Sequence, residues 1–181
     1  MKKVKLFVIT GGPGVGKTTL LNALGKLGFS VVMEDARRII QEQIQNDGEG
    51  VPWKNKIYYA QLMLAASLET YQRTIDETSS NIVFFDRGIL DTICYMKMEN
   101  IPITEEMNNL VCAHTYNRKV FILPPWEEIY ATDNERKQTW EEAVLTFDKM
   151  KQTYLEYGYE VIEVPKNSVE CRCEFILRHI H

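Results

Sequence analysis

The sequence predicts an α/β fold in which a five-stranded parallel sheet is flanked by helices, as a three-layer sandwich. Short apolar stretches alternate along the chain with longer segments of helical periodicity, which is the order that crossover connections require. The run Ile82–Phe85 is continuously apolar, as is typical of a strand covered by helices on both faces. Because the chain has 181 residues, of which 45% are hydrophobic, we expect one domain over residues 1–181.

The first strand and the first helix enclose a glycine-rich stretch. An apolar run that ends at Thr10 and consists of Val4, Leu6, Phe7, Val8 and Ile9 predicts a buried strand. Beyond the glycines, four leucines recur at helical spacing, and Gly28 follows them as the expected C-terminal cap. These leucines are Leu20, Leu21, Leu24 and Leu27.

Turn residues and apolar periodicity place the next elements. The segment Asn46–Gly50 separates two helices, because asparagine, aspartate and glycine favour turns. In chain order we expect a strand over Phe29–Met33, a helix over about Asp35–Gln45, a long helix with an apolar stripe from Ala60 to Ile75, a strand over Ile82–Phe85 and a helix over Leu90–Met98.

The rest of the chain continues the alternation. Thr104 precedes Glu105 and Glu106, as expected of an N-cap followed by acids that favour the positive end of a helix. We then expect a strand over Lys119–Leu123, a polar stretch over residues 127–137, a helix with an apolar face from Trp140 through Val144 to Tyr157, a strand over Glu160–Val164 and a helix that Ser168 opens.

The glycine-rich stretch, residues 11–18, matches the pattern G-x-x-x-x-G-K-[ST] of a phosphate-binding loop, the P-loop or Walker A motif. It lies between a predicted strand and a predicted helix, where backbone N–H groups converge on phosphate oxygens at a positive helix end. We therefore predict that the chain binds a nucleoside triphosphate, either ATP or GTP. The expected contacts are Gly11, Gly12, Pro13, Gly14, Val15, Gly16, Lys17, Thr18 and Thr19.

Polar side chains beside this loop predict phosphoryl chemistry. We expect Lys17 to reach the β- and γ-phosphates and the Thr18 hydroxyl to ligate Mg²⁺. Asp86 ends an apolar strand, and ligands bind at the carboxyl ends of parallel strands, so it is the expected Walker B ligand of the same ion. Arg87 and Asp91 follow as candidate substrate-binding residues; alternatively, they form a structural ion pair with each other.

Glu34 ends the second predicted strand, so by the same argument it faces the ligand. It is a candidate catalytic base that takes the proton of an acceptor hydroxyl. Arg37 lies one helical turn further on and is a candidate for binding an anionic group of the substrate. The alternative is that Glu34 favours the start of the helix and that Arg37 is merely solvated.

The polar stretch 127–137 is a candidate for a movable cover over the site. Arg136 is its best candidate for a catalytic positive charge on the transferred phosphoryl group, although the charges there form a solvated cluster in the alternative interpretation. Trp53, Tyr58 and Tyr59 are candidates for stacking on a planar ring, or else belong to the core.

Charge and composition limit the partners. The net charge of −4 provides no general attraction to nucleic acid or anionic lipid, so the pair Arg37-Arg38 is expected to act locally on a phosphate-bearing small molecule. No segment is long and apolar enough to span a bilayer, so we expect no membrane insertion. The four cysteines show neither metal-site spacing nor a disulfide framework, which favours a cytoplasmic protein with reduced thiols and Cys171 and Cys173 in packing roles.

Three motifs in this order resemble a known group: the P-loop, Glu34-Asp35-Ala36-Arg37 and Phe84-Phe85-Asp86-Arg87-Gly88. The chain resembles the small P-loop ATPase/kinase family with an AAA-type label, and is similar over nearly its whole length to the ribosylnicotinamide kinase domain of bacterial NAD regulators. The resemblance to nucleoside and nucleotide kinases implies that Asp86 and Arg87 are the Asp-Arg pair that follows the third strand in those enzymes, that Glu34 acts on the acceptor and that Arg136 is the lid arginine.

Together these features predict an enzyme that uses Mg²⁺ and ATP to phosphorylate a small hydroxyl-bearing, nucleoside-like acceptor. The strand-end Glu34 favours this hypothesis, because a nucleotide switch needs no acid for an acceptor. Two alternatives remain: a regulatory nucleotide-binding module with a protein or lipid partner, and a simple hydrolase of ATP or GTP. A signalling GTPase is disfavoured, because the guanine-binding Asn-Lys-x-Asp is absent.

Overall fold

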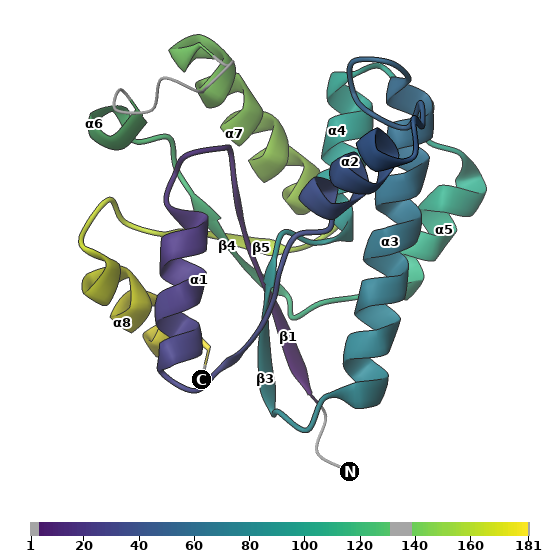
Figure 1. Ribbon diagram of the computed structural model, residues 1–181. Coiled ribbons are helices and arrows are strands. Elements are labelled where there is room, and N and C mark those ends of the chain that lie inside the picture. Colours follow the sequence, from purple (N-terminus) through teal and green to yellow (C-terminus); the bar gives the residue numbers. More distant parts are fainter. Residues whose placement is uncertain (1–3, 131–138, 181) are drawn as a thin grey trace. The chain divides into compact units, whose positions relative to one another are not determined.

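The computed structural model describes residues 4–130 and 139–180 (Figure 1). All five predicted strands form one parallel sheet in the order β2-β3-β1-β4-β5, which confirms the predicted fold class. The strands are β1 Lys5–Gly11, β2 Ser30–Val32, β3 Ile82–Asp86, β4 Lys119–Leu123 and β5 Glu160–Glu163. None of the helices in these two ranges has the length and apolar character needed to cross a membrane.

The helices follow the predicted order, with one addition. They are α1 Lys17–Lys26, α2 Ala36–Gln45, α3 Lys56–Glu77, α4 Ile89–Met98, α5 Glu105–Ala113, α6 Glu127–Tyr130, α7 Trp140–Glu156 and α8 Val169–His179. The short α6 lies where the sequence predicted only a polar stretch. Both predicted N-caps are confirmed, because the hydroxyls of Thr104 and Ser168 accept hydrogen bonds from the N–H groups three residues on.

The chain groups into two compact units. The first consists of Met1–Val32, Ser80–Arg87 and Tyr116–His181, and it contains the whole sheet with α1, α6, α7 and α8. The second consists of Met33–Ser79 and Gly88–Thr115, and it contains α2, α3, α4 and α5. The assignment of residues 1–181 to a single domain stays a prediction.

Within the first unit, helices cover both faces of the sheet. One face packs against α1 and α8, which contact each other (Figure 1). This core consists mainly of Phe7, Ile9, Phe84 and Phe121 from the sheet, Val164 just after β5, and Leu20, Leu24, Cys173 and Ile176 from the helices. Successive side chains of a strand alternate between faces, so Thr10 points to the other face, where its hydroxyl contacts the Met150 sulfur of α7 at 3.9 Å.

Two lysines of the sheet hold the C-terminal end of α8. Lys119 donates a hydrogen bond of 2.8 Å to the carbonyl of His179, and Lys5 donates one of 3.4 Å to that of Ile180. Cations at this end of a helix satisfy its last carbonyl groups and interact favourably with its dipole. The position of α8 against the sheet is therefore fixed at its end as well as along its apolar face.

The predicted apolar face of α7 is partly wrong. Val144 is exposed, whereas Ala143, Thr146 and Thr153 are buried together with Phe147, Met150 and Tyr154. Alanine and threonine side chains form part of the buried face of α7. A prediction from the spacing of large apolar residues alone therefore places the boundary of this face incorrectly. On α3, likewise, Ile75 at the end of the predicted stripe is exposed.

In the second unit, the turn between α2 and α3 is held by Gln43. The Gln43 carbonyl accepts a hydrogen bond from the N–H of Gly48 at 2.7 Å, and its side-chain oxygen accepts one from the N–H of Gly50 at 2.9 Å. Val51 beyond them is buried, and Asn55 caps α3 through the N–H of Tyr58. The segment 46–55 is thus tied to both helices by backbone hydrogen bonds.

Candidate functional site

The P-loop leads from β1 directly into α1, as the sequence predicted. Gly11 has φ +144°, and a Cβ there would lie 2.7 Å from the Leu123 carbonyl oxygen of β4. Gly16 has φ +84° and is the residue before the first turn of α1. L-residues with a side chain disfavour both conformations, so the motif glycines are required by backbone geometry.

Lys17 is buried and curls back over the loop. Its ammonium group donates hydrogen bonds of 3.0 Å to the carbonyls of Gly11 and Gly12. These carbonyls accept hydrogen bonds from the ammonium group but do not neutralise its charge. Lys17 lies at the N-terminal end of α1, where the helix dipole favours an anion. A phosphate arriving at this end would meet a positive group already in place.

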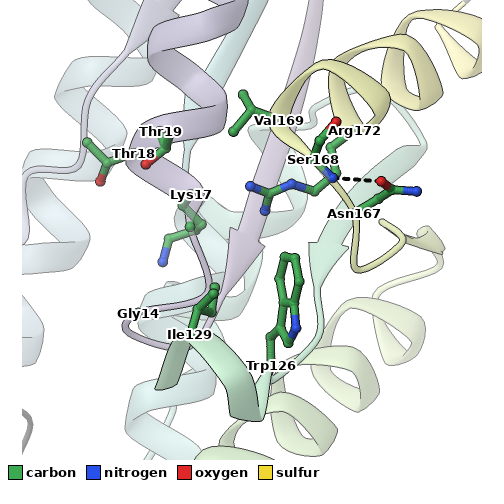
Figure 2. Close-up of a pocket in the computed structure, with 11 residues that line it drawn as sticks. Gly14, Lys17, Thr18, Thr19, Trp126, Ile129, Asn167, Ser168, Val169 and Arg172 are labelled. Atoms are coloured by element: carbon green, nitrogen blue, oxygen red, sulfur yellow. Dashed lines mark hydrogen bonds between the residues drawn. The ribbon is translucent and has the colours of Figure 1, made fainter. Parts of the chain in front are cut away.

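A cavity of about 540 Å³ adjoins the loop, and all of its lining belongs to the first unit (Figure 2). Gly14, Gly16, Lys17, Thr18 and Thr19 form one side, and Trp126, Ile129, Asn167, Ser168, Val169 and Arg172 form the rest. One side therefore carries the positive end of a helix, and the other carries an indole ring and aliphatic groups together with the polar Asn167 and Ser168 and the cationic Arg172. This combination suits a ligand that has both phosphate groups and a planar ring.

Trp126 and Arg172 were not predicted as site residues. Trp126 follows β4, and Arg172 lies in the first turns of α8, both far from the P-loop in sequence. The guanidinium carbon of Arg172 lies 5.8 Å from the centre of the Trp126 ring. One signal was present, because the helical spacing of Val169, Cys173 and Ile176 places Arg172 on the same face as these residues, which pack in the core.

Asp86 is placed as predicted for a Walker B acid. It is the last residue of β3, is 6% exposed and pairs in register with Ile9 of the neighbouring β1. A threonine hydroxyl and a carboxylate are both hard oxygen ligands, so Thr18 and Asp86 fit the chemistry of Mg²⁺, which also takes phosphate oxygens and water. The next residue, Arg87, leaves the strand with φ +68°, a strained conformation that often marks functional sites.

Asp91 has a defined structural role in the second unit. It is buried in the first turn of α4, and its carboxylate accepts a 2.8 Å hydrogen bond from the N–H of Gly88. The carboxylate thus satisfies a backbone donor at the start of the helix. The proposed contact of Asp91 with substrate, and its pairing with Arg87, stay predictions.

We expect Asp91→Ala to lower the free energy of unfolding by about 1–2 kcal/mol, because it removes the partner of a buried N–H group. Asp91→Asn keeps an acceptor oxygen and should retain most of this stability. Urea denaturation of both variants measures the difference. If Asn and Ala destabilise the protein equally, the charge rather than the hydrogen bond stabilises the helix, and the capping role is refuted.

Glu34 and Arg37 belong to the second unit. Glu34 is partly buried just before α2, and Arg37 is exposed on the first turn of that helix. Within the described residues, no hydrogen bond or ion pair involves the side chain of Arg37. The neighbouring Arg38, in contrast, pairs with Asp35 at 2.9 Å and Glu42 at 2.8 Å, which raises the pKa of its guanidinium.

Arg38 thus forms ion pairs with Asp35 and Glu42 on the surface, and the expectation that Arg37 and Arg38 act on a small molecule stays a prediction. Asp35 also accepts a 2.8 Å hydrogen bond from the Thr70 hydroxyl, which ties the start of α2 to α3. Arg37 keeps its predicted role as a candidate for an anionic group.

The three aromatic residues that the sequence offered for stacking on a planar ring differ in their exposure to solvent. Tyr59 is buried and packs edge-to-face on Tyr95, with ring centres 5.5 Å apart, so it belongs to the core. Trp53 is 62% exposed and Tyr58 is 41% exposed. The core interpretation is thus correct for Tyr59 and wrong for Trp53. Arg136 lies outside the described residues, and its role stays a prediction.

The fold and the loop define a P-loop protein of the α/β class. The family model described as "AAA domain" matches residues 6–172, so the chain belongs to this AAA domain family. The comparison with curated proteins yields no match.

Solved structures of several kinases share the fold. The NadR protein in complex with NR is similar with a TM-score of 0.75 and 18% identity, over 98% of this chain and 50% of that one. Deoxyadenosine kinase from M. mycoides is similar with a TM-score of 0.63 and 19% identity, over 96% of this chain and 97% of that one. Thymidylate kinase from Candida albicans is similar with a TM-score of 0.64 and 18% identity, over 98% of this chain and 91% of that one.

These likenesses establish the fold. The chain spans about half the length of the NadR protein. At identities of this level, the activity and the substrate must be argued from the residues of this chain.

Proposed function

We propose that the protein is a kinase that transfers the γ-phosphoryl group of ATP to the hydroxyl group of a small, nucleoside-like acceptor. The observation that carries this proposal is the cavity beside the P-loop, with the positive end of α1 on one side and Trp126 on the other. Phosphoryl transfer needs little covalent chemistry from the protein, so positioning and positive charge account for most of the catalysis.

The nucleotide is proposed to lie with its phosphates on the P-loop and its base in the cavity. Lys17 would exchange the carbonyls of Gly11 and Gly12 for the β- and γ-phosphates. The indole of Trp126 offers an apolar face to a planar base. Both ends of the ligand are thus held by groups that the first unit provides.

Mg²⁺ is proposed to be held by the Thr18 hydroxyl and the Asp86 carboxylate. When bound, it would neutralise charge on the phosphate oxygens. Lys17 binds the same phosphates and adds positive charge as the bond between the γ-phosphorus and the departing ADP lengthens.

The acceptor is proposed to be served by Glu34, Arg37 and Arg136. The carboxylate of Glu34 would accept the proton of the acceptor hydroxyl as its oxygen attacks the γ-phosphorus. Arg37 would bind an anionic group of the acceptor, and Arg136 would stabilise the transferred group. The fold shared with NadR, deoxyadenosine kinase and shikimate kinase from Acinetobacter baumannii supports a kinase.

One observation favours a kinase over a nucleotide switch. A switch would require segment 47–56 or 127–137 to rearrange with the nucleotide. The backbone of residues 46–55 is held by Gln43, by the buried Val51 and by the cap of α3, so the first of these segments is poorly suited to such a change.

A screen of acceptors tests the proposal. ADP release from ATP and from GTP is measured with a panel of nucleosides, nicotinamide riboside, nucleoside monophosphates and shikimate-like hydroxy acids. At least one acceptor should stimulate ADP release and appear as a phosphorylated product by mass spectrometry. Slow ADP release that no acceptor stimulates would instead indicate a hydrolase or a binding module.

We also expect turnover to depend on Mg²⁺ and on Asp86. Excess chelator should abolish activity, and Asp86→Asn should lower kcat by about 10²-fold or more, because one of the two protein ligands loses its charge. Asp148→Asn, on the exposed face of α7, is the matched control and should leave kcat unchanged. Full activity in chelator would remove the metal from the mechanism.

A further inference from the structure

Arg172 is a charged residue in a position that a hydrophobic residue would normally occupy. It is 5% exposed and lies on the face of α8 that packs toward α1 and the sheet. No carboxylate among the described residues pairs with it, and its Nε atom is buried without a hydrogen-bond partner in those residues. Burial lowers the pKa of this guanidinium from its usual value. A buried, unpaired cation is costly, so its retention calls for a compensating role.

The guanidinium contacts the backbone of the P-loop. Its Nη1 atom donates a 3.3 Å hydrogen bond to the carbonyl of Val15. Gly16 lies directly against it, because a Cβ on Gly16 would be 3.0 Å from Nη1 and 3.2 Å from Nη2. Glycine at this position therefore allows both the left-handed turn into α1 and the close approach of Arg172.

The contact with Val15 fixes the direction of a phosphate-binding group. The carbonyl of Val15 and the N–H of Gly16 belong to one peptide, which is planar and trans, so the two groups point in opposite directions. When Arg172 holds the carbonyl, the N–H of Gly16 points away from the guanidinium. Backbone N–H groups of such loops are the groups that bind phosphate oxygens.

The ring of Trp126 also limits the position of the Arg172 guanidinium. The ring lies under the guanidinium in the cavity (Figure 2), with 5.8 Å between the guanidinium carbon and the ring centre. A cation over an aromatic face is attracted to it, and the planar group is held against rotation. The P-loop, α8 and the segment after β4 thus meet at one side chain.

We propose that Arg172 is a positioning residue for the phosphate loop: it holds the Val15 peptide so that the Gly16 N–H faces the phosphates, and it places a fixed positive charge behind them. This inference rests on the proposed nucleotide-binding function. It assigns to Arg172 a role toward phosphate, distinct from a contact with the base.

Calorimetric titration with two probes separates these roles. Inorganic tripolyphosphate has the three phosphates of ATP without its base, and ADP has the base with two of these phosphates. Arg172→Met should weaken the binding of both probes by about 10- to 100-fold, the range for a hydrogen bond from a charged donor. Arg172→Lys keeps a donor and a charge, so it should restore part of the affinity for both.

Arg178→Met is the matched control. Arg178 lies on the same helix, but it is exposed and pairs with Glu174 on the surface, so both affinities should stay as in the unaltered protein. Thermal unfolding of each variant checks the fold, and Arg172→Gln, with the same expected loss, replaces Arg172→Met if the latter does not fold.

The outcomes are distinct. Parallel losses for tripolyphosphate and ADP, with partial rescue by lysine, support the proposal. A loss for ADP alone would make Arg172 a base contact, and unchanged binding of both probes would make it a packing residue; either result overturns the proposal. If the unaltered protein binds neither probe, the proposed function itself fails, and this inference fails with it.

Discussion

Lys17→Ala is expected to lower turnover by about 10²- to 10³-fold and to weaken the binding of ATP and GTP. In the structure its ammonium rests on the Gly11 and Gly12 carbonyls at 3.0 Å, next to the N-terminal end of α1. In the alanine variant the phosphates of the nucleotide therefore lack this ammonium group, which in the unaltered protein has only to exchange the two carbonyls for phosphate oxygens. The apolar core of α1 does not include Lys17, so the fold should survive.

Calorimetry with both nucleotides and thermal unfolding measure these effects. Lys26→Ala is the matched control, because Lys26 is exposed in the last turn of the same helix. Unchanged affinity of Lys17→Ala for both nucleotides would contradict the assignment of the phosphate loop.

Glu34→Gln is expected to abolish acceptor-stimulated ADP formation while nucleotide affinity stays nearly intact. The amide keeps the shape of the side chain but cannot accept a proton, and loss of a general base typically costs about 10²- to 10⁴-fold in turnover. The effect should appear in kcat with the best acceptor of the panel.

Glu42→Gln makes the same chemical change on the exposed side of α2 and serves as the control. Its ion pair with Arg38 is on the surface, so it should alter neither activity nor stability by much. If Glu34→Gln is silent and no acceptor stimulates ADP release, the kinase proposal fails and a nucleotide-binding module becomes the better hypothesis.

The sequence predicted the strands well, because each contains a short apolar stretch that is followed by a clear stop. Lys119–Leu123 ends before two prolines, and Ile82–Phe85 ends at Asp86. Helix faces were predicted less well. Ala143 and Thr146 carry part of the α7 contact, and neither side chain adds to an apolar pattern. The short α6 escaped prediction because four residues, two of them glutamates, show no periodicity.

The candidate site was predicted only where it is local in sequence. The P-loop and Asp86 are defined by motifs and by strand ends, so their positions follow from the order of the elements. Arg172 and Trp126 reach the cavity from two distant segments, and only tertiary packing brings them beside Gly16. The roles of Glu34 and Arg37 toward an acceptor stay predictions.

The central place of β1 in the sheet has a consequence for synthesis of the chain. Both neighbours of β1 come much later, since β3 begins at Ile82 and β4 at Lys119. During translation the apolar run Leu6–Ile9 emerges long before any strand that can pair with it, and such an exposed segment is prone to aggregate. Lysines at positions 2, 3 and 5 precede the run, and charges beside an apolar strand oppose self-association. We therefore expect these lysines to oppose aggregation of the nascent chain until its sheet can form.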